Sequence, residues 1–161
     1  MENELFLSRP AEVLLAEDND NDVELTRQGF KRTKLLLNLH RVRDGEECLA
    51  FLRKEGQYAS APTPDLILLD VNMPKVSGRE VLAQMATDER LKSLPVVVLT
   101  TSEESSEILG MYQLRCSSYI VKPIDFEQFL RVVPSIADYW FTVVVLPKAA
   151  SNENVKTELA V

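Results

Sequence analysis

The sequence predicts an α/β fold built on a doubly wound parallel sheet. Five short apolar runs alternate with amphipathic stretches, and three of the runs are continuously apolar, which is typical of parallel strands covered on both faces. The chain of 161 residues suits one domain, because compact domains cluster near about 100 to 150 residues. With 45% hydrophobic and 27% charged residues, the composition excludes disorder, a collagen-like repeat and a membrane bundle.

The apolar runs predict strands over residues 13–16, 37–42, 66–69, 96–99 and 119–121. The amphipathic stretches predict helices over residues 22–31, 45–54, 77–87, 105–114 and 125–139. We expect Asp125 to cap the last helix, with Gln128 at the capping-box position. Pro134 should kink or split that helix, because proline lacks an N–H and its ring clashes with the preceding turn. Five such βα units predict a flavodoxin-like (βα)5 sheet with strand order 2-1-3-4-5.

The charge balance and the cysteines exclude several classes of function. A net charge of −7 would repel a phosphate backbone, so we expect no direct nucleic-acid binding. No apolar run approaches the roughly 20 residues of a membrane-spanning helix, and residues 1–6 carry no cationic leader region, so we expect a cytoplasmic protein. Cys48 and Cys116 lie far from the lone histidine, His40, which predicts neither a disulfide framework nor a zinc site.

The end of the chain changes in character twice. Residues 141–147 are too apolar for a free tail, whereas residues 148–161 are polar and should fray. The expected division is a domain over 11–140, an apolar extension over 141–147 and a flexible tail over 148–161. Large apolar side chains predict a homodimer interface, formed by Tyr139, Trp140, Phe141, Val143 and Val145. The alternative is that this segment folds back on its own domain.

Polar side chains follow four of the five predicted strands, where an open parallel sheet binds its ligands. They are Glu17 and Asp18 after the first strand, Asp70 after the third, Thr100 and Thr101 after the fourth, and Lys122 after the fifth. The second strand should contribute nothing. In the expected strand order these residues would converge on one crevice.

The three acids predict a magnesium site. Crowded carboxylates raise one another's pKa unless cations neutralise them. Mg²⁺ prefers carboxylate, water and phosphate oxygens, and Lys122 supplies a further positive charge. For any single acid the alternative is a helix cap, a role open to Asp18 or the neighbouring Asn19. Asp70, on the most apolar strand, is the candidate nucleophile for an aspartyl phosphate, with Thr100 and Lys122 on the phosphoryl oxygens.

Four motifs together resemble the receiver domain of two-component response regulators. They are Glu17-Asp18, Asp70-Val71-Asn72-Met73-Pro74 followed by Gly78, Thr100-Thr101-Ser102, and Tyr119-Ile120-Val121-Lys122-Pro123. The resemblance covers residues 11–138. It implies that Asp70 accepts a phosphoryl group from a phosphohistidine of a sensor histidine kinase.

The same resemblance implies roles for the other residues. It makes Asp18, Asp70 and the backbone carbonyl of Asn72 direct Mg²⁺ ligands, with Glu17 acting through water. It makes Thr100 and Lys122 a switch pair and Tyr119 an aromatic switch, and it implies a cis peptide bond before Pro123. Glu17 stands where an Asp is more general in the family, which should alter the water network around the metal.

Parts of the chain are similar, more narrowly, to the small response regulators of cyanobacterial phytochromes. These parts are the loop over 57–64, the stretches 66–82 and 94–102, and the aromatic exit over 138–147. This likeness implies a phytochrome-like kinase as phosphoryl donor and a homodimer paired through residues 139–146. Too few residues follow the receiver for a DNA-binding helix-turn-helix domain, so we expect the signal to pass to a protein partner.

Three other readings fit less well. A haloacid-dehalogenase-type phosphatase needs a second Asp two residues after the nucleophile, where this chain has Asn72. Phosphate-binding loops need glycines after the first strand, whereas residues 17–22 (EDNDND) would repel phosphate. A phosphorylation-silent pseudo-receiver would need a defect at Asp70, Thr100 or Lys122. We therefore expect a signalling protein that assists only its own phosphorylation and dephosphorylation, not an enzyme.

Overall fold

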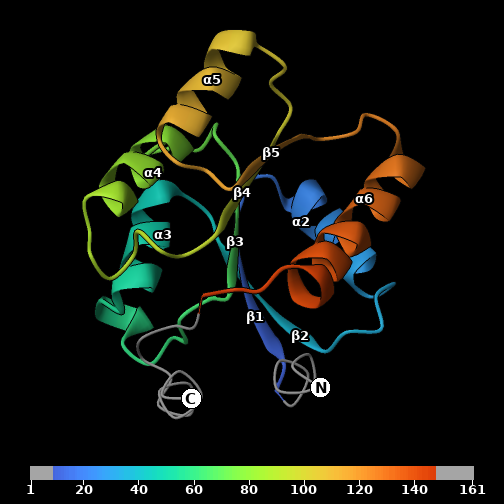
Figure 1. The fold of residues 1–161 in the computed structure, drawn as a ribbon, viewed down its shortest axis with the longest axis horizontal. Coiled ribbons are helices and arrows are strands. Elements are labelled where there is room, and N and C mark those ends of the chain that lie inside the picture. The colour runs from blue at the N-terminus through green and yellow to red at the C-terminus, as the bar shows by residue number, and fades with distance from the viewer. Residues whose placement is uncertain (1–8, 148–161) are drawn as a thin grey trace.

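A computed structural model of the chain describes residues 9–147. Five parallel strands form one sheet in the order β2-β1-β3-β4-β5 (Figure 1). The strands are β1 (Ala11–Ala16), β2 (Leu37–Val42), β3 (Leu66–Leu69), β4 (Val96–Thr100) and β5 (Ser118–Val121). This arrangement confirms the predicted flavodoxin-like α/β class and its strand order.

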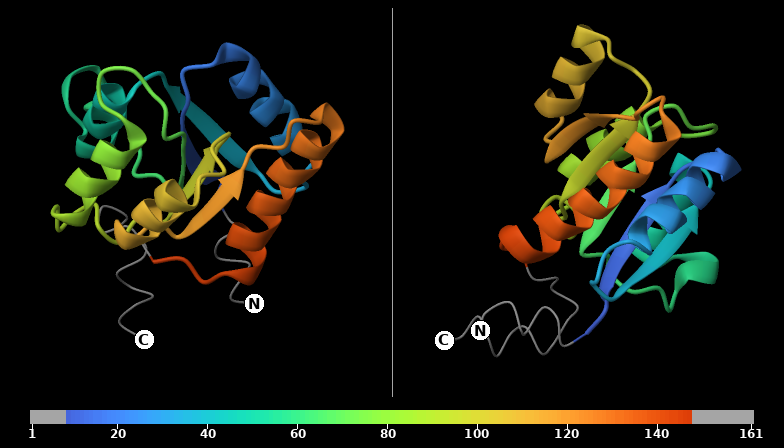
Figure 2. Two further views of the ribbon diagram at one scale, coloured as in Figure 1. Left: turned by 90° about the horizontal axis from the view of Figure 1, so that it is seen from above. Right: turned by 90° about the vertical axis from the view of Figure 1, so that its right-hand side faces the viewer.

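Helices cover both faces of the sheet. The helices α2 (Asp20–Phe30) and α6 (Phe126–Asp138) lie on one face, and α3 (Gly45–Arg53), α4 (Gly78–Ala86) and α5 (Ser105–Gln113) lie on the other. Figure 2 shows the same three layers from two further directions. Each predicted helix is present within three residues of its expected bounds. Two covered faces explain why the central strands are apolar at successive positions.

The core consists of two apolar clusters, one on each face of the sheet. Along β3, Ile67 and Leu69 belong to the cluster under α3 and α4, whereas Leu66 and Leu68 belong to the cluster under α2 and α6. All four are fully buried, and burying each such side chain stabilises the fold by roughly 1.5 to 3 kcal/mol. The strand β3 is therefore packed against helices on both faces, directly before Asp70.

Side-chain caps begin three of the helices. Asn19, Asp44 and Ser77 each accept a hydrogen bond from a backbone N–H three residues later, at the starts of α2, α3 and α4. Asp125 occupies the predicted N-cap position of α6, but its side chain makes no capping hydrogen bond, so that expectation was wrong in its chemistry.

The helix α6 continues through Pro134 without a break, so the proline does not split it. Packing overrides the proline: Phe129, Leu130 and Val133 are buried on the inner face of this helix. Gly29 of α2 permits a close approach, since a Cβ there would lie 2.6 Å from Cβ of Val133. The loss of one backbone hydrogen bond is thus offset by a long apolar contact with α2.

A π-helical turn over Tyr139–Val143 follows α6. Phe141 and Leu146 are only 4% and 3% exposed and belong to the core cluster under α2 and α6. Phe141 is therefore part of the protomer's own core, and its assignment to a dimer interface was wrong, because a side chain already buried has no surface to offer. The predicted polar tail over 148–161 lies outside the described residues.

Both described ends of the chain lie at the amino end of the strands (Figure 1). Cys48 and Cys116 are free and buried, and burial raises the pKa of the Cys48 thiol to about 12. Across residues 9–147, no helix is both long enough and apolar enough to cross a membrane.

Candidate functional site

The polar residues at the carboxyl ends of the strands lie together. Glu17, Asp70 and Lys122 are 2%, 7% and 7% exposed, and Thr100 is fully buried at the end of β4. Carboxylate oxygens of Glu17, Asp18 and Asp70 all lie within 4.8 Å of one another. The structure thus brings together the three acids that the sequence analysis assigned to one crevice. An oxygen-only donor set of this kind fits a hard divalent cation.

The Lys122 ammonium is surrounded by carboxylates. Its Nζ donates to Oε1 of Glu17 and, over 2.8 Å, to Oδ2 of Asp22, while Oδ2 of Asp70 lies 3.5 Å away. Asp22, in the first turn of α2, was not among the predicted site residues. In the sequence Asp22 looks like an ordinary acid at a helix N-terminus. The only signal for a role in the site was its short distance along the chain, five residues, from Glu17.

Burial sets the electrostatics of this pair. Burial raises the pKa of Glu17 to about 7, although the Lys122 ammonium favours the charged carboxylate. Burial acts to lower the pKa of Lys122, but the hydrogen bonds to Asp22 and Glu17 and the charge of Asp70 outweigh it, so this pKa is raised. Lys122 therefore stays positively charged, and Glu17 can gain or lose its proton near neutral pH.

An arginine from the edge strand β2 holds the acidic loop after β1. Arg41 donates from Nε to the carbonyl oxygen of Glu17 over 2.9 Å, and from Nη2 to the carbonyl oxygen of Asp18 over 3.3 Å and to Asp20 over 2.9 Å. The expectation that the second strand contributes nothing was therefore wrong, because a long side chain reaches the loop from the edge of the sheet.

The backbone after Asp70 passes close to the start of α4. The N–H of Asn72 donates to Oδ1 of Asp70 over 3.3 Å, and the N–H of Gly78 donates to the carbonyl oxygen of Val71 over 2.9 Å. A Cβ on Gly78 would lie 2.3 Å from the carbonyl oxygen of Asp70. Only glycine at this position allows α4 to begin beside the site.

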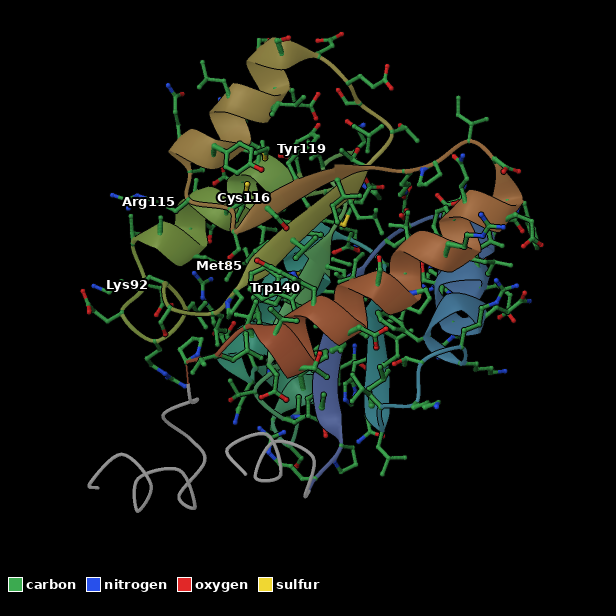
Figure 3. All side chains as sticks on the ribbon, turned by 45° about the vertical axis from the view of Figure 1, so that its right-hand side comes forward. Met85, Lys92, Arg115, Cys116, Tyr119 and Trp140 are labelled. Atoms are coloured by element: carbon green, nitrogen blue, oxygen red, sulfur yellow. The ribbon has the colours of Figure 1, made fainter. Side chains whose placement is uncertain are left out.

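Thr100 and Tyr119 lie on the side of the site that faces α5. Among the described residues, Oγ1 of Thr100 is buried without a hydrogen-bond partner. A buried unpaired hydroxyl is costly, so this oxygen is available to bond a ligand or a water molecule. Tyr119 of β5 is half-buried against α5 (Figure 3), and burial raises the pKa of its hydroxyl.

The peptide bond between Lys122 and Pro123 is trans, since residues 9–147 contain no cis peptide bond. The expected cis bond before Pro123 is thus contradicted. Trans is the intrinsically favoured isomer of an X–Pro bond by about 0.5–1 kcal/mol, and Lys122 reaches its three carboxylates from this form.

Comparison with known proteins identifies the family. The family model described as a response regulator receiver domain matches residues 13–134. The chain belongs to the response regulator receiver family. Receivers are in general signalling proteins, and the site described above lies within the matched segment.

This receiver is similar to regulators of phytochrome signalling. It is 39% identical over 140 residues to "Response regulator Rcp1" of Synechocystis sp., covering 87% of this chain and 95% of that protein. A structure of the phosphorylated cyanobacterial phytochrome response regulator RcpA is 41% identical, with a TM-score of 0.84 over 87% of this chain and all of that one. A Mn²⁺-bound form of Rcp1 is 38% identical, with a TM-score of 0.82 over 86% of this chain and all of that one.

Proposed function

We propose that this receiver accepts a phosphoryl group on Asp70 from a phosphohistidine of a sensor histidine kinase, with Mg²⁺ as cofactor. One observation carries the proposal: the buried Asp70 carboxylate lies in one cluster with two further acids and a buried lysine, and β4, the neighbouring strand, ends in a buried threonine whose hydroxyl is unpaired. The phosphorylated state of the relative RcpA supports it.

The residues present fit the metal. Asp18, Asp70 and the backbone carbonyl of Asn72 would hold Mg²⁺ directly, and Glu17 would act through a water molecule. When bound, Mg²⁺ neutralises charge on the carboxylates and on the incoming phosphoryl oxygens.

The transfer itself needs mainly positioning. An oxygen of Asp70 forms a bond to phosphorus as the P–N bond of phosphohistidine breaks, and the imidazole nitrogen keeps the electron pair of that bond. Lys122 and the Thr100 hydroxyl donate hydrogen bonds to the phosphoryl oxygens. Later attack by water returns Asp70 and releases phosphate. The receiver thus assists only its own phosphorylation and dephosphorylation and is not an enzyme acting on other substrates.

The output is a conformational change read by a protein partner. Thr100 moves toward the phosphoryl group, and Tyr119 follows it, which reshapes the face made by α5 and β5. Shifting a two-state element from 1:99 to 99:1 needs about 5.5 kcal/mol. Two or three charge-assisted hydrogen bonds of roughly 1.5–3 kcal/mol each can supply this.

We propose that the sensor kinase that phosphorylates this receiver is phytochrome-like. The phytochrome regulator RcpA, at 41% identity, supports this partner. Two buried free thiols and the acidic net charge are compatible with a cytoplasmic protein that binds no nucleic acid.

The receiver also forms a homodimer in this proposal, through the end of α6 and the turn that follows it. Tyr139, Val143 and Val145 are 53%, 69% and 92% exposed. The ring of Tyr139 meets the half-buried Trp140 edge-to-face, with ring centroids 5.6 Å apart, and Figure 3 shows Trp140 at the C-terminal end of α6. A two-fold contact would cover these side chains with the same patch of a second copy.

The dimer is tested by sedimentation at micromolar concentration with the double variant Val143→Ser, Val145→Ser. The parent should sediment as a dimer and the variant as a monomer. A parent that sediments as a monomer with and without a phosphoryl donor contradicts the dimer.

Phosphorylation is tested by incubating the protein with acetyl phosphate and Mg²⁺ and measuring its mass. The parent should gain one hydroxylamine-labile phosphoryl group, and Asp70→Asn should gain none. Asp125→Asn, an exposed acid whose side chain makes no cap, should be labelled like the parent. Labelling of Asp70→Asn at the parental level would refute the proposed site.

A further inference from the structure

A fourth carboxylate, that of Asp22, binds the lysine of the site without belonging to the cation cluster. Oδ2 of Asp22 accepts a hydrogen bond from Nζ of Lys122 over 2.8 Å. The carboxylates close enough to share a cation are those of Glu17, Asp18 and Asp70, and Asp22 is not among them. Its contact with the site therefore runs through Lys122.

The position of Asp22 is set by the start of α2. The N–H of Asp22 donates to Oδ1 of Asn19 over 3.0 Å, which closes the first turn of the helix. Next to it, the loop carbonyls of Glu17 and Asp18 are held by Arg41. The side chain of Asp22 is 26% exposed and that of Lys122 is 6% exposed, so their contact is shielded from water on the lysine side.

The donors of Lys122 are divided unequally. An ammonium has three N–H donors, and the shorter contacts go to Glu17 and Asp22, while Asp70 lies 3.5 Å away. Lys122 is thus bound more closely to the β1–α2 side of the pocket than to the acid that would carry phosphate. A cation in the cluster would interact with the Glu17 carboxylate and so compete with Lys122 for it, whereas Asp22 would remain bonded to Lys122.

We propose that Asp22 is a positioning residue that holds Lys122 on the α2 side of the pocket and competes for it with the phosphoryl group on Asp70. This inference rests on the proposed function. When a phosphoryl group forms, Lys122 gives up or shares its bond to Asp22, so that Asp22 limits how tightly the phosphorylated state is held. Removing its charge should release the lysine to the phosphoryl oxygens.

Binding of beryllofluoride at a fixed, saturating concentration of Mg²⁺ tests this inference, because beryllofluoride forms a tetrahedral phosphoryl mimic on a carboxylate. Binding is followed by NMR through the amide signals of residues 70–72. Asp22→Asn should bind the mimic on the order of 5- to 20-fold more tightly than the parent, since one charge-assisted competitor is lost. Unchanged or weaker binding would overturn the inference.

A matched control separates contact from long-range charge. Glu24→Gln removes the same charge two residues further along α2. Glu24 is exposed, and its carboxylate accepts a hydrogen bond from Gln28 over 3.4 Å. It should bind the mimic within about twofold of the parent, because exposed charges are screened. An equal gain in beryllofluoride affinity in both variants would show that the change in net charge alone is responsible and would refute the positioning role of Asp22.

A double-mutant cycle with Lys122→Met gives the second readout. If Asp22 acts through Lys122, then Asp22→Asn should have no effect on affinity in the Lys122→Met background. A gain that persists there contradicts the inference. A parent that binds no mimic at all refutes the proposed function itself, whereas a parent that binds it while Asp22→Asn behaves like Glu24→Gln refutes only the role of Asp22.

Discussion

The Tyr119 hydroxyl donates a hydrogen bond to the backbone carbonyl oxygen of Ser102 over 2.9 Å. This contact joins β5 to the loop that leaves β4 two residues after Thr100. Ser102 in turn donates from Oγ to Glu107 of α5 over 2.7 Å. A displacement of Thr100 would therefore pass along the chain to Ser102. From there these two hydrogen bonds would transmit it to β5 and α5.

Replacing Thr100 by valine should separate stability from switching. Because Oγ1 is buried without a partner among the described residues, its removal should leave stability unchanged or raise it by about 1 kcal/mol, as measured by urea unfolding without metal. The same variant should bind beryllofluoride with Mg²⁺ about tenfold more weakly, through loss of one charge-assisted hydrogen bond. A variant that is less stable but binds normally would show that the hydroxyl serves the fold and not the site.

Glu17 should make both stability and metal affinity depend on pH. Its pKa is raised from 4.5 to about 7 in the folded protein, so the folded state keeps a proton that the unfolded state loses. This stabilisation is complete below pH 4.5 and disappears as the pH rises to about 7. Relative to Glu17→Gln, the free energy of unfolding of the metal-free parent should fall over this range.

Affinity for Mg²⁺ should change in the opposite direction, because the metal needs the deprotonated carboxylate. It should rise with pH and level off above about 7, by up to tenfold per pH unit. Calorimetric titration at several pH values measures this. Parallel pH profiles for the parent and Glu17→Gln would contradict the raised pKa.

Gly78→Ala should lower both stability and the rate of phosphorylation, although Gly78 is not itself a site residue. The new Cβ would lie 2.3 Å from the carbonyl oxygen of Asp70 and 2.8 Å from Cα of Val71, both backbone atoms that cannot rotate away. We expect a loss of stability of about 1–3 kcal/mol, typical of overpacking, together with slower labelling by acetyl phosphate. Gly56→Ala is a useful contrast, since a Cβ there meets nothing within 4 Å and its positive φ of 58° is the only source of strain. It should label at the parental rate.

Phe141→Ala should unfold at lower denaturant than the parent. Phe141 is 4% exposed in the core under α2 and α6, and truncating a buried Phe costs about 3–5 kcal/mol. Val145→Ala, at a position that is 92% exposed, should change monomer stability by less than about 0.5 kcal/mol. Equal effects of the two substitutions would mean that residues 141–146 do not pack as described.

The strands and the main acids could be predicted from sequence because both follow local rules. A continuously apolar run such as Leu66–Leu69 fits a strand covered on both faces, and parallel strands bring their carboxyl ends to one edge. Asp22 and Arg41 could not be found in this way. Their roles depend on where a long side chain or a helix turn points, which no periodicity encodes.

The end of the chain shows a second limit of sequence reasoning. Apolar character alone could not tell which side chains of residues 139–146 turn inward, and the π-helical turn places Phe141 in the core and Val143 at the surface. Pro134 likewise removes one backbone hydrogen bond from α6. The sequence shows this loss, but not the packing of α6 on α2 that offsets it.

The two described ends of the chain lie at the amino end of the strands, whereas the acidic site follows their carboxyl ends. The body of the sheet therefore stands between any attachment at those ends and the pocket. A fluorophore, an affinity handle or a link to a solid support placed there would leave the pocket mouth open to a partner as large as a kinase. The same geometry makes a surface-tethered form of this protein suitable for testing, one molecule at a time, whether the proposed kinase binds at the pocket.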